Sequence, residues 1–327
     1  MKKIKLYLFT WLIFSIYPIL ALYAQEKISI DTFTCGAGWG KDYCKPQKIN
    51  VDLYIPKNSF NAPLVILQHG SGGINTAVTE KIQLLTNRNY VVAINDAFTS
   101  RGISKSHFDY AGTAANGGNA RSMAIDSLAI ILALQNDKRI NVTKTAIIGF
   151  SQGGLVSYWL KSDNFLQSIA VKLLGNLIQP KLVIAMYGCS GEFNENFQFN
   201  NLPVEVVVGD QDPVLKKCYE FKKRLVSSRQ PANVNITVLK NAYHGFDENY
   251  LRKIWPKNQE VENCYTLRKL DGSVENPFIG KSYEGQNIEK QIINDCIKYG
   301  QYAGNNGDPK IGDQPILNAL EKYVKPN

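Results

Sequence analysis

Ser151 lies at the centre of a segment that can present a reactive hydroxyl. The segment reads Gly149-Phe150-Ser151-Gln152-Gly153-Gly154, with an apolar run before it and a helix-compatible run after it. A G-x-S-x-G pattern between a strand and a helix is typical of a tight turn that exposes a nucleophilic serine at a helix N-terminus. Glycines two residues before and after the serine leave room for this turn. The alternative is a glycine-rich turn with an incidental serine.

His244 is the candidate base for this serine. A serine hydroxyl is a poor nucleophile until a base takes its proton, and the base needs an acid to orient it. The chain has three histidines, His69, His107 and His244, and only His244 follows Ser151. In proteins with this type of turn, the three catalytic residues follow one another along the chain in the order serine, acid and histidine. A surface histidine on a turn is the alternative interpretation.

Asp212 is the candidate acid. The segment between the serine and the histidine reads Val208-Gly209-Asp210-Gln211-Asp212-Pro213 and directly follows an apolar strand pattern. Asp212 precedes Pro213, which suits the start of a helix, and it lies further from the strand end than Asp210. The same position also favours a helix N-cap. Asp210 remains the alternative acid.

Two backbone amides are expected to stabilise an oxyanion. One is the amide of Gln152, the residue after the serine. The other is expected in the loop His69-Gly70-Ser71-Gly72-Gly73, which follows the second strand pattern. Ser71 is the first choice and Gly72 the second. His69 is expected to shape this loop rather than to bind a metal.

The elements that position these residues alternate between strands and helices. Strands are expected over residues 49–55, 63–68, 91–95, 145–148, 181–186, 204–208 and 234–239, and helices over 78–85, 120–134, 214–226 and 316–324. This alternation predicts an α/β fold with a doubly wound, mostly parallel sheet and helices on both faces. The strand over 49–55 is expected to be an antiparallel edge strand, and residues 25–47 a disulfide-closed loop.

The N-terminal segment predicts export. Lys2, Lys3 and Lys5 precede an apolar run from Leu6 to Leu22. Residues 1–24 are therefore expected to be a signal peptide and residues 25–327 a single domain of a periplasmic or secreted protein. Within this domain, the polar, Gly- and Asn-rich stretch at about 250–312 is expected to form a C-terminal excursion, a disulfide-held segment outside the regular pattern of strands and helices. No stable membrane span is expected after cleavage, and an uncleaved anchor is the alternative.

The six cysteines all lie after this segment, which favours three disulfides. Cys189 and Cys218 lie near the same sheet edge and are expected to pair. Sequence proximity and elimination pair Cys35 with Cys44 and Cys264 with Cys296. The chain has no C-x-x-C and no H-x-x-x-H, so we expect neither a metal nor another cofactor.

Charge and composition indicate no nucleic-acid partner. The net charge of the 327 residues is +9, but the basic residues are scattered and often adjoin acidic ones. No basic run is interleaved with stacking aromatic residues, as a nucleic-acid interface would favour. The sequence leaves the oligomeric state open.

Several short motifs together resemble the dienelactone hydrolase family of the α/β-hydrolase fold, especially its exported members with disulfides. They are His69-Gly70-Ser71-Gly72-Gly73, Asp96-Ala97-Phe98-Thr99-Ser100-Arg101-Gly102, Gly149-Phe150-Ser151-Gln152-Gly153-Gly154, Tyr187-Gly188-Cys189, Gly209-Asp210-Gln211-Asp212-Pro213 with Cys218, and Tyr243-His244-Gly245-Phe246-Asp247. The resemblance covers roughly residues 45 to 250. The namesake enzyme of the family has a cysteine nucleophile, whereas this chain has Ser151. The resemblance therefore implies hydrolysis of small carboxylic esters or lactones rather than of dienelactone itself.

Residues on short loops are expected to contact such a substrate. They are Phe98, Arg101, Tyr187 and Phe246. Arg101 follows a strand end and is expected to hold a substrate carboxylate; a structural ion pair with Asp96 or Asp126 is the alternative. A peptidase or acyltransferase with the same three catalytic residues, and an envelope protein that only binds, are the alternative functions.

Overall fold

The computed structural model describes residues 23–36, 41–104, 117–227, 233–260, 263–269, 273–284 and 288–326. Most of the expected signal peptide lies outside these ranges. Its last two residues, Tyr23 and Ala24, begin the first strand. None of the helices in the described ranges has the length and apolar character needed to cross a membrane.

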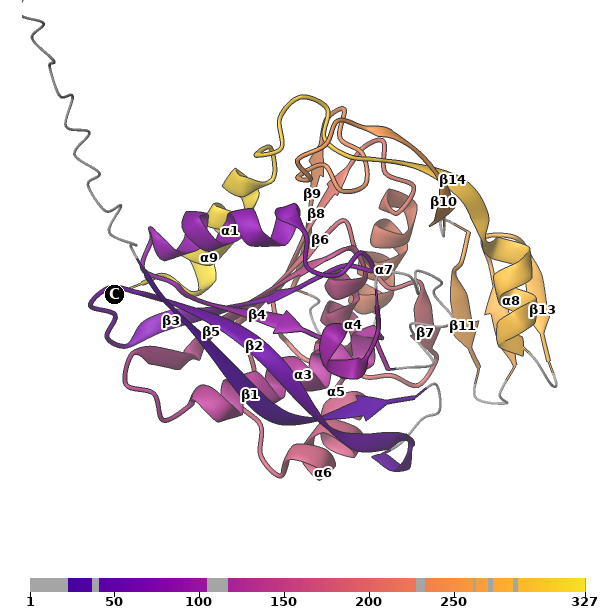
Figure 1. The fold of residues 1–327 in the computed structure, drawn as a ribbon. Coiled ribbons are helices and arrows are strands. Elements are labelled where there is room, and N and C mark those ends of the chain that lie inside the picture. Colours follow the sequence, from indigo (N-terminus) through magenta and orange to yellow (C-terminus); the bar gives the residue numbers. More distant parts are fainter. Residues whose placement is uncertain are drawn as a thin grey trace, which may run out of the picture.

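An eight-stranded sheet forms the centre of the molecule (Figure 1). Its order is β1-β2-β4-β3-β5-β6-β8-β9. The strands are β1 (Tyr23–Cys35), β2 (Cys44–Pro56), β3 (Ala62–Gln68), β4 (Val91–Asp96), β5 (Ile140–Phe150), β6 (Leu182–Met186), β8 (Val204–Gly209) and β9 (Val234–Leu239). The six strands from β4 to β9 in this order are parallel, whereas β1 and β2 run antiparallel to their neighbours. The α/β fold with a mostly parallel sheet is therefore as predicted.

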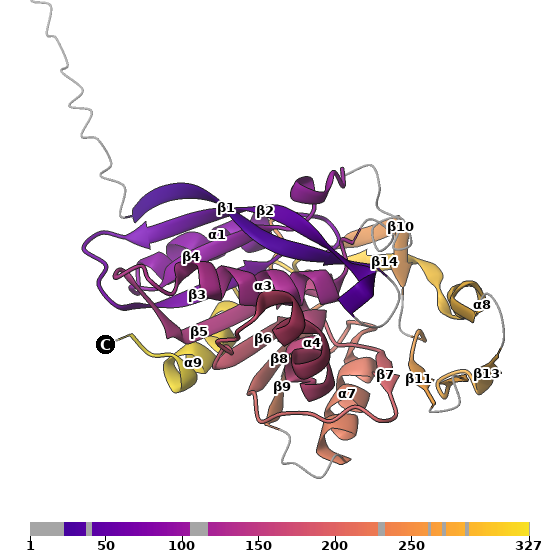
Figure 2. The ribbon, with the colours of Figure 1, turned by 90° about the horizontal axis from the view of Figure 1, so that it is seen from below.

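Helices cover both faces of this sheet (Figures 1 and 2). One face carries α1 (Thr76–Thr86) and α9 (Asp313–Tyr323). The other carries α3 (Ala120–Leu134), α4 (Val156–Lys161), α5 (Asp163–Phe165), α6 (Val171–Leu174) and α7 (Leu215–Ser227). Successive residues of β3 face opposite cores: Leu64 and Ile66 pack on the α3 side, Val65 and Leu67 on the α1 side. Burial on both faces explains why the central strands are almost entirely apolar.

Two expectations about the N-terminal part were only partly right: the Cys35–Cys44 disulfide and the antiparallel direction of β2 are confirmed, whereas the extent of the loop and the edge position of the strand are not. Residues 25–47 are mostly strand, because β1 pairs with β2 along a long ribbon that ends with Cys35 opposite Cys44. The edge strand is therefore β1, and β2 lies between β1 and β4. The apolar pattern of β1 is weak because only Ile30, Thr32 and Cys35 of this strand are buried.

Small strands occupy the C-terminal excursion and lie beside the main sheet in Figure 1. A two-stranded sheet pairs β10 (Lys253–Glu260) with β14 (Lys298–Ala303). A four-stranded sheet joins β11 (Thr266–Arg268), β12 (Val274–Asn276) and β13 (Lys281–Tyr283) of the excursion to β7 (Glu192–Asn194), which lies between β6 and β8 in the chain, and α8 (Ile288–Cys296) follows β13. Strands of three residues are too short to produce a recognisable alternation, so sequence periodicity did not predict them.

Three disulfides join the predicted pairs. Cys35 is bonded to Cys44 at the end of the β1–β2 ribbon, and Cys264 to Cys296 within the excursion. Cys189 is bonded to Cys218, with their Cα atoms 5.1 Å apart. This last bond ties the segment after β6 to α7, close to the strand ends that carry the candidate site.

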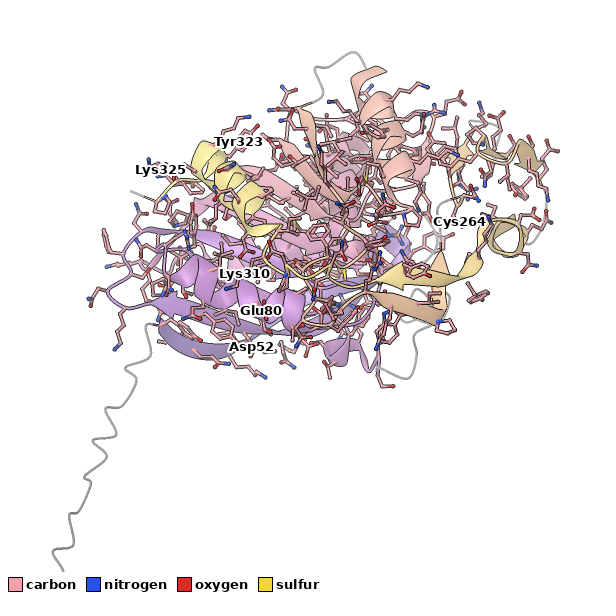
Figure 3. The ribbon with its side chains drawn as sticks, turned by 90° about the horizontal axis from the view of Figure 1, so that it is seen from above. Asp52, Glu80, Cys264, Lys310, Tyr323 and Lys325 are labelled. Atoms are coloured by element: carbon pink, nitrogen blue, oxygen red, sulfur yellow. A yellow bond between two sulfur atoms is a disulfide. The ribbon has the colours of Figure 1, made fainter. Side chains whose placement is uncertain are left out.

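The final helix closes one face of the sheet. Figure 3 looks onto this face, with Glu80 on α1 and with Tyr323 and Lys325 at the far end of α9. Ile316 and Leu320 of α9 are fully buried in the same core as α1. The Tyr323 hydroxyl donates to Glu205 Oε1 at 3.2 Å, which fixes the helix end to β8.

Leu320→Ala is expected to lower the free energy of unfolding by about 2–5 kcal/mol, because it removes a fully buried side chain from a close-packed core. Asn318→Ala on the exposed side of α9 is the control and should change stability by less than about 0.5 kcal/mol. Urea unfolding followed by circular dichroism measures both. Equal stability of the two variants would show that α9 does not contribute to this core.

Candidate active site

Ser151 occupies a strained turn at the end of β5. Its φ is +51°, which is unusual for a residue with a side chain and persists only where the surroundings impose it. A Cβ on Gly149 would lie 2.1 Å from the carbonyl oxygen of Gly153, and one on Gly153 would lie 2.3 Å from the carbonyl oxygen of Gln68. Both positions therefore need glycine, as the sequence pattern indicated.

The structure brings Ser151, His244 and Asp212 together from three segments of the chain. Ser151 Oγ lies 2.9 Å from His244 Nε2, and His244 Nδ1 lies 2.9 Å from Asp212 Oδ2. His244 is on the loop after β9, and Asp212 lies between β8 and α7. With its proton on Nδ1, the imidazole donates to Asp212 and accepts the Ser151 hydroxyl proton at Nε2.

Asp212, and not Asp210, contacts the histidine. The Asp212 side chain is fully buried, whereas Asp210 is exposed. The second carboxylate oxygen of Asp212, Oδ1, accepts a hydrogen bond from the Val214 amide at 2.9 Å. Asp212 thus fulfils both interpretations of its position, since one oxygen caps the segment that leads into α7 and the other faces His244. The cap fixes the carboxylate so that its free oxygen points at the imidazole.

The loop after β3 packs against the serine. A Cβ on Gly70 would lie 3.1 Å from Ser151 Cβ, so this loop approaches the nucleophile as closely as its side-chain-free backbone allows. The Gly73 amide donates to the Gly70 carbonyl at 3.1 Å, and Ser71 and Gly72 lie exposed in the resulting turn. The Gln152 side chain donates to the Gly118 carbonyl. The backbone amides of Gln152 and of Ser71 or Gly72 stay predicted oxyanion donors.

His69 has the structural role that was expected. Its Nδ1 donates to the Gly70 carbonyl at 2.8 Å, and its ring meets the Phe98 ring edge-on with centroids 4.4 Å apart. Burial lowers the pKa of His69 below its ordinary value, which favours the neutral form of the ring. His69 and Phe98 together hold the shape of the loop beside Ser151.

The predicted substrate contact of Arg101 was wrong. Its guanidinium is buried and forms a bidentate ion pair with Asp126, at 2.9 Å for both bonds. The remaining N–H groups donate to Thr34 Oγ1 and to the carbonyls of Phe33 and Ala97. No donor is left for a substrate carboxylate, and Arg101 has the alternative role of a structural ion pair.

The three aromatic residues expected to line a substrate pocket are also buried. The exposed fraction is 7% for Phe98, 3% for Tyr187 and 1% for Phe246. Phe98 packs on His69, and Phe246 packs on Tyr187 with ring centroids 5.1 Å apart. These side chains support the loops around Ser151 instead of lining an open pocket.

Sequence reasoning missed two residues close to the site. Asp247 is fully buried and accepts a hydrogen bond from the Tyr187 hydroxyl at 2.7 Å. Lys81 of α1 is buried beside it. Asp247 belongs to a motif already singled out with His244, which was a usable signal, but nothing in the helix pattern around Lys81 indicated a role near the site.

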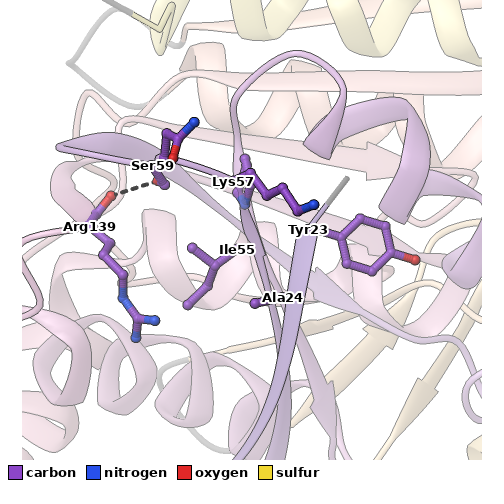
Figure 4. Close-up of a pocket in the computed structure, with 8 residues that line it drawn as sticks. Tyr23, Ala24, Ile55, Lys57, Ser59 and Arg139 are labelled. Carbon is purple, nitrogen blue, oxygen red and sulfur yellow. Dashed lines mark hydrogen bonds between the residues drawn. The ribbon is translucent and has the colours of Figure 1, made fainter. Parts of the chain in front are cut away.

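Two observations concern the described residues outside this site. Within the described residues, no cluster of three or more His, Cys, Asp or Glu side chains could hold a metal ion. A surface hollow lies between Tyr23, Ile55, Lys57 and Arg139, where the Ser59 hydroxyl donates to the Arg139 carbonyl at 3.0 Å (Figure 4). It is at the opposite end of the sheet from Ser151, since β2 ends there and β5 begins there.

A comparison with protein-family models identifies the family. The model described as "Dienelactone hydrolase family" matches residues 49–265, which is more than half of the chain and includes Ser151, Asp212 and His244. The chain belongs to the dienelactone hydrolase family. A fold with an esterase-like hydrolase architecture follows from this membership.

Solved structures of family members and of esterases are similar at low identity. A dienelactone hydrolase from Anabaena variabilis is 14% identical, with 68% of this chain and 88% of that chain covered and a TM-score of 0.46. A hyperthermophilic esterase from Pyrobaculum calidifontis is 14% identical, with 67% and 78% covered and a TM-score of 0.43. A dienelactone hydrolase-like promiscuous phosphotriesterase from metagenomic libraries is 17% identical, with 69% and 85% covered and a TM-score of 0.42. No curated protein matches the chain.

Arg101→Gln is expected to lower the free energy of unfolding by about 3–5 kcal/mol, because it leaves the buried Asp126 carboxylate without its counter-ion. The exposed Arg88 provides the control, and Arg88→Gln should have little effect. Urea unfolding measures both. A stable Arg101→Gln protein that lost only the hydrolysis of carboxylate-bearing esters would restore the predicted substrate contact.

Proposed function

We propose that this protein is an exported serine hydrolase that cleaves small carboxylic esters or lactones through an acyl-enzyme. The observation that carries the proposal is the continuous hydrogen-bond path from Ser151 Oγ through His244 to Asp212. Such a path activates a serine hydroxyl that is otherwise unreactive at neutral pH. Membership of the dienelactone hydrolase family supports the assignment of an ester substrate.

The reaction begins when Ser151 Oγ attacks the ester carbonyl carbon while His244 Nε2 takes the hydroxyl proton. Asp212 stabilises the resulting imidazolium and keeps its ring oriented. The carbonyl oxygen becomes an oxyanion, which the amide of Gln152 and that of Ser71 or Gly72 stabilise. Collapse of this intermediate expels the alcohol, which leaves with the proton from His244, and leaves an acyl group on Ser151.

Water completes the cycle by the same chemistry. His244 Nε2 takes a proton from a water molecule as its oxygen attacks the acyl carbon. The second oxyanion then collapses, releases the carboxylic acid and returns the proton to Ser151 Oγ. A lactone gives the same sequence, except that the alcohol and the acid stay joined in one hydroxy-acid product.

Export is proposed on two features. The N-terminal segment has the charged and apolar regions of a signal peptide. All six cysteines form disulfides in the structure, and disulfides persist in oxidising compartments. A periplasmic or secreted location satisfies both features.

Ser151→Ala is expected to lower kcat/KM on nitrophenyl acetate by at least about 10⁴-fold, because the nucleophile is lost. Asp212→Asn should lose about 10⁴-fold, because the imidazole is held in the wrong tautomer. The exposed Asp210 provides a matched control, and Asp210→Asn should stay within about twofold of the parent protein, since Asp210 makes no contact with His244. A collapse of activity in Asp210→Asn together with an active Asp212→Asn would refute the assignment of the acid.

Short acyl chains are expected to be preferred over long ones. Phe98, Tyr187 and Phe246, the aromatic residues expected near the substrate, are buried, so they do not line an open apolar channel that could hold a long acyl chain. Hydrolysis of nitrophenyl acetate, butyrate and palmitate should therefore give the lowest kcat/KM for palmitate. A higher value for palmitate, or cleavage of peptides but not of esters, would contradict the proposed substrate class.

A further inference from the structure

We propose that Asp247 is a positioning residue that aligns His244 through Tyr187, with Lys81 as its buried counter-ion. The proposal rests on the function proposed above. It adds a second acid to the site, one that does not contact the imidazole itself and that no catalytic motif assigns.

Tyr187 connects Asp247 to the histidine ring. Its hydroxyl donates to Asp247 Oδ1 at 2.7 Å. Its ring meets the His244 ring at an interplanar angle of 65°, with centroids 5.0 Å apart. Asp247 and His244 are only three residues apart in the same loop, so Tyr187 contacts both the ring and the anchor of that loop. The position of the Tyr187 ring therefore limits how the imidazole can turn.

Tyr187 is itself held rigidly beside the nucleophile. It follows the last residue of β6, its φ is +40°, and its amide donates to the Val207 carbonyl of β8 at 2.7 Å. The next residue is Gly188, where an added Cβ would lie 2.0 Å from the Ser151 carbonyl oxygen. The same short segment thus contacts the backbone of Ser151 and the side chain of His244. Tyr187 therefore has a fixed position between the backbone of Ser151 and the side chain of His244.

Lys81 and Asp313 complete the arrangement from two helices. Lys81 Nζ lies 3.6 Å from Asp247 Oδ2 and 2.7 Å from Asp313 Oδ1. The Asp247 side chain is fully buried, and a buried carboxylate without a counter-ion is strongly destabilising. Burial raises the pKa of Asp247, and the Lys81 charge and the Tyr187 hydroxyl oppose that rise. Burial also keeps Tyr187 in its phenol form, because it raises the pKa of Tyr187 well above its ordinary value.

Other contacts anchor the loop independently of Asp247. The carboxylate of Glu248 accepts hydrogen bonds from Asn75 and Thr76 at the start of α1. The Gly304 amide donates to the His244 carbonyl at 2.9 Å. The loop therefore stays attached when the Tyr187–Asp247 bond is removed. What is lost is the alignment of the imidazole, which makes the two roles separable by experiment.

The test compares Tyr187→Phe with Tyr283→Phe. The control removes an equivalent hydroxyl, because Tyr283 donates to Asp295 Oδ2 at 3.1 Å and Asp295 pairs with Lys281, away from His244. Tyr187→Phe keeps the ring and removes only the bond to Asp247. Its kcat on nitrophenyl acetate should fall roughly tenfold to 100-fold with KM within about twofold, as expected for misalignment of a catalytic group. Tyr283→Phe should keep the parent kcat.

A spectroscopic readout reports alignment without turnover. The proton that His244 Nδ1 donates to Asp212 should give a strongly downfield NMR resonance in the parent protein. Tyr187→Phe should shift or broaden this resonance, and Tyr283→Phe should not. Adding Asp247→Ala to Tyr187→Phe should reduce kcat no further than the worse single variant, since each substitution removes the Tyr187–Asp247 hydrogen bond.

Two results would overturn the proposal and differ from each other. An active parent protein in which Tyr187→Phe keeps the parent kcat and the parent resonance would show that Asp247 only stabilises the fold. A parent protein that neither hydrolyses esters nor reacts with a serine-directed phosphonate would refute the proposed function, and the positioning role with it. Urea unfolding of every variant separates loss of alignment from loss of folded protein.

Discussion

The candidate site depends on how closely backbone segments approach one another beneath Ser151. An added Cβ would meet a carbonyl oxygen within 2.3 Å at each of Gly149, Gly153 and Gly188. The strained φ of Ser151 follows from this crowding, because the surrounding backbone leaves the turn no relaxed alternative. The result is a serine hydroxyl held at the sheet edge with little freedom. Every other group of the site is positioned relative to this turn, from Gly70 on one side to Tyr187 on the other.

Two buried carboxylates flank His244 and differ in their partners. Asp212 accepts one bond from the imidazole and one from the Val214 amide, so its charge faces the ring. Asp247 accepts from the Tyr187 hydroxyl and lies near Lys81, so its charge is compensated away from the ring. The same residue type thus serves two purposes according to its neighbours. Only the first can stabilise an imidazolium directly; the second can act only through the side chains between.

The sequence was informative wherever local pattern decides structure. Ser151, Asp212 and His244 come together as expected because parallel strands place their ends at one edge of the sheet, and the helix over 120–134 has the predicted bounds. The sequence left alternatives open, or gave no signal, wherever a distant partner decides; for Arg101 it offered both a substrate carboxylate and Asp126. Arg101 lies on a rim loop, but its guanidinium turns inward to Asp126, 25 residues away. The pairing of Lys81 with Asp247 and Asp313 joins segments that no local pattern connects.

Two residues that are synthesised late, Gly304 and Asp313, make contacts that support the candidate site. Ser151, Asp212 and His244 are all present in a growing chain before the ribosome has added Gly304 and Asp313. Gly304 braces the His244 carbonyl, and Asp313 pairs with the lysine beside Asp247. A chain that stopped before Gly304 would carry Ser151, Asp212 and His244 without these two contacts. The contacts that hold the candidate site therefore extend along the chain as far as Asp313, well beyond Ser151, Asp212 and His244 themselves.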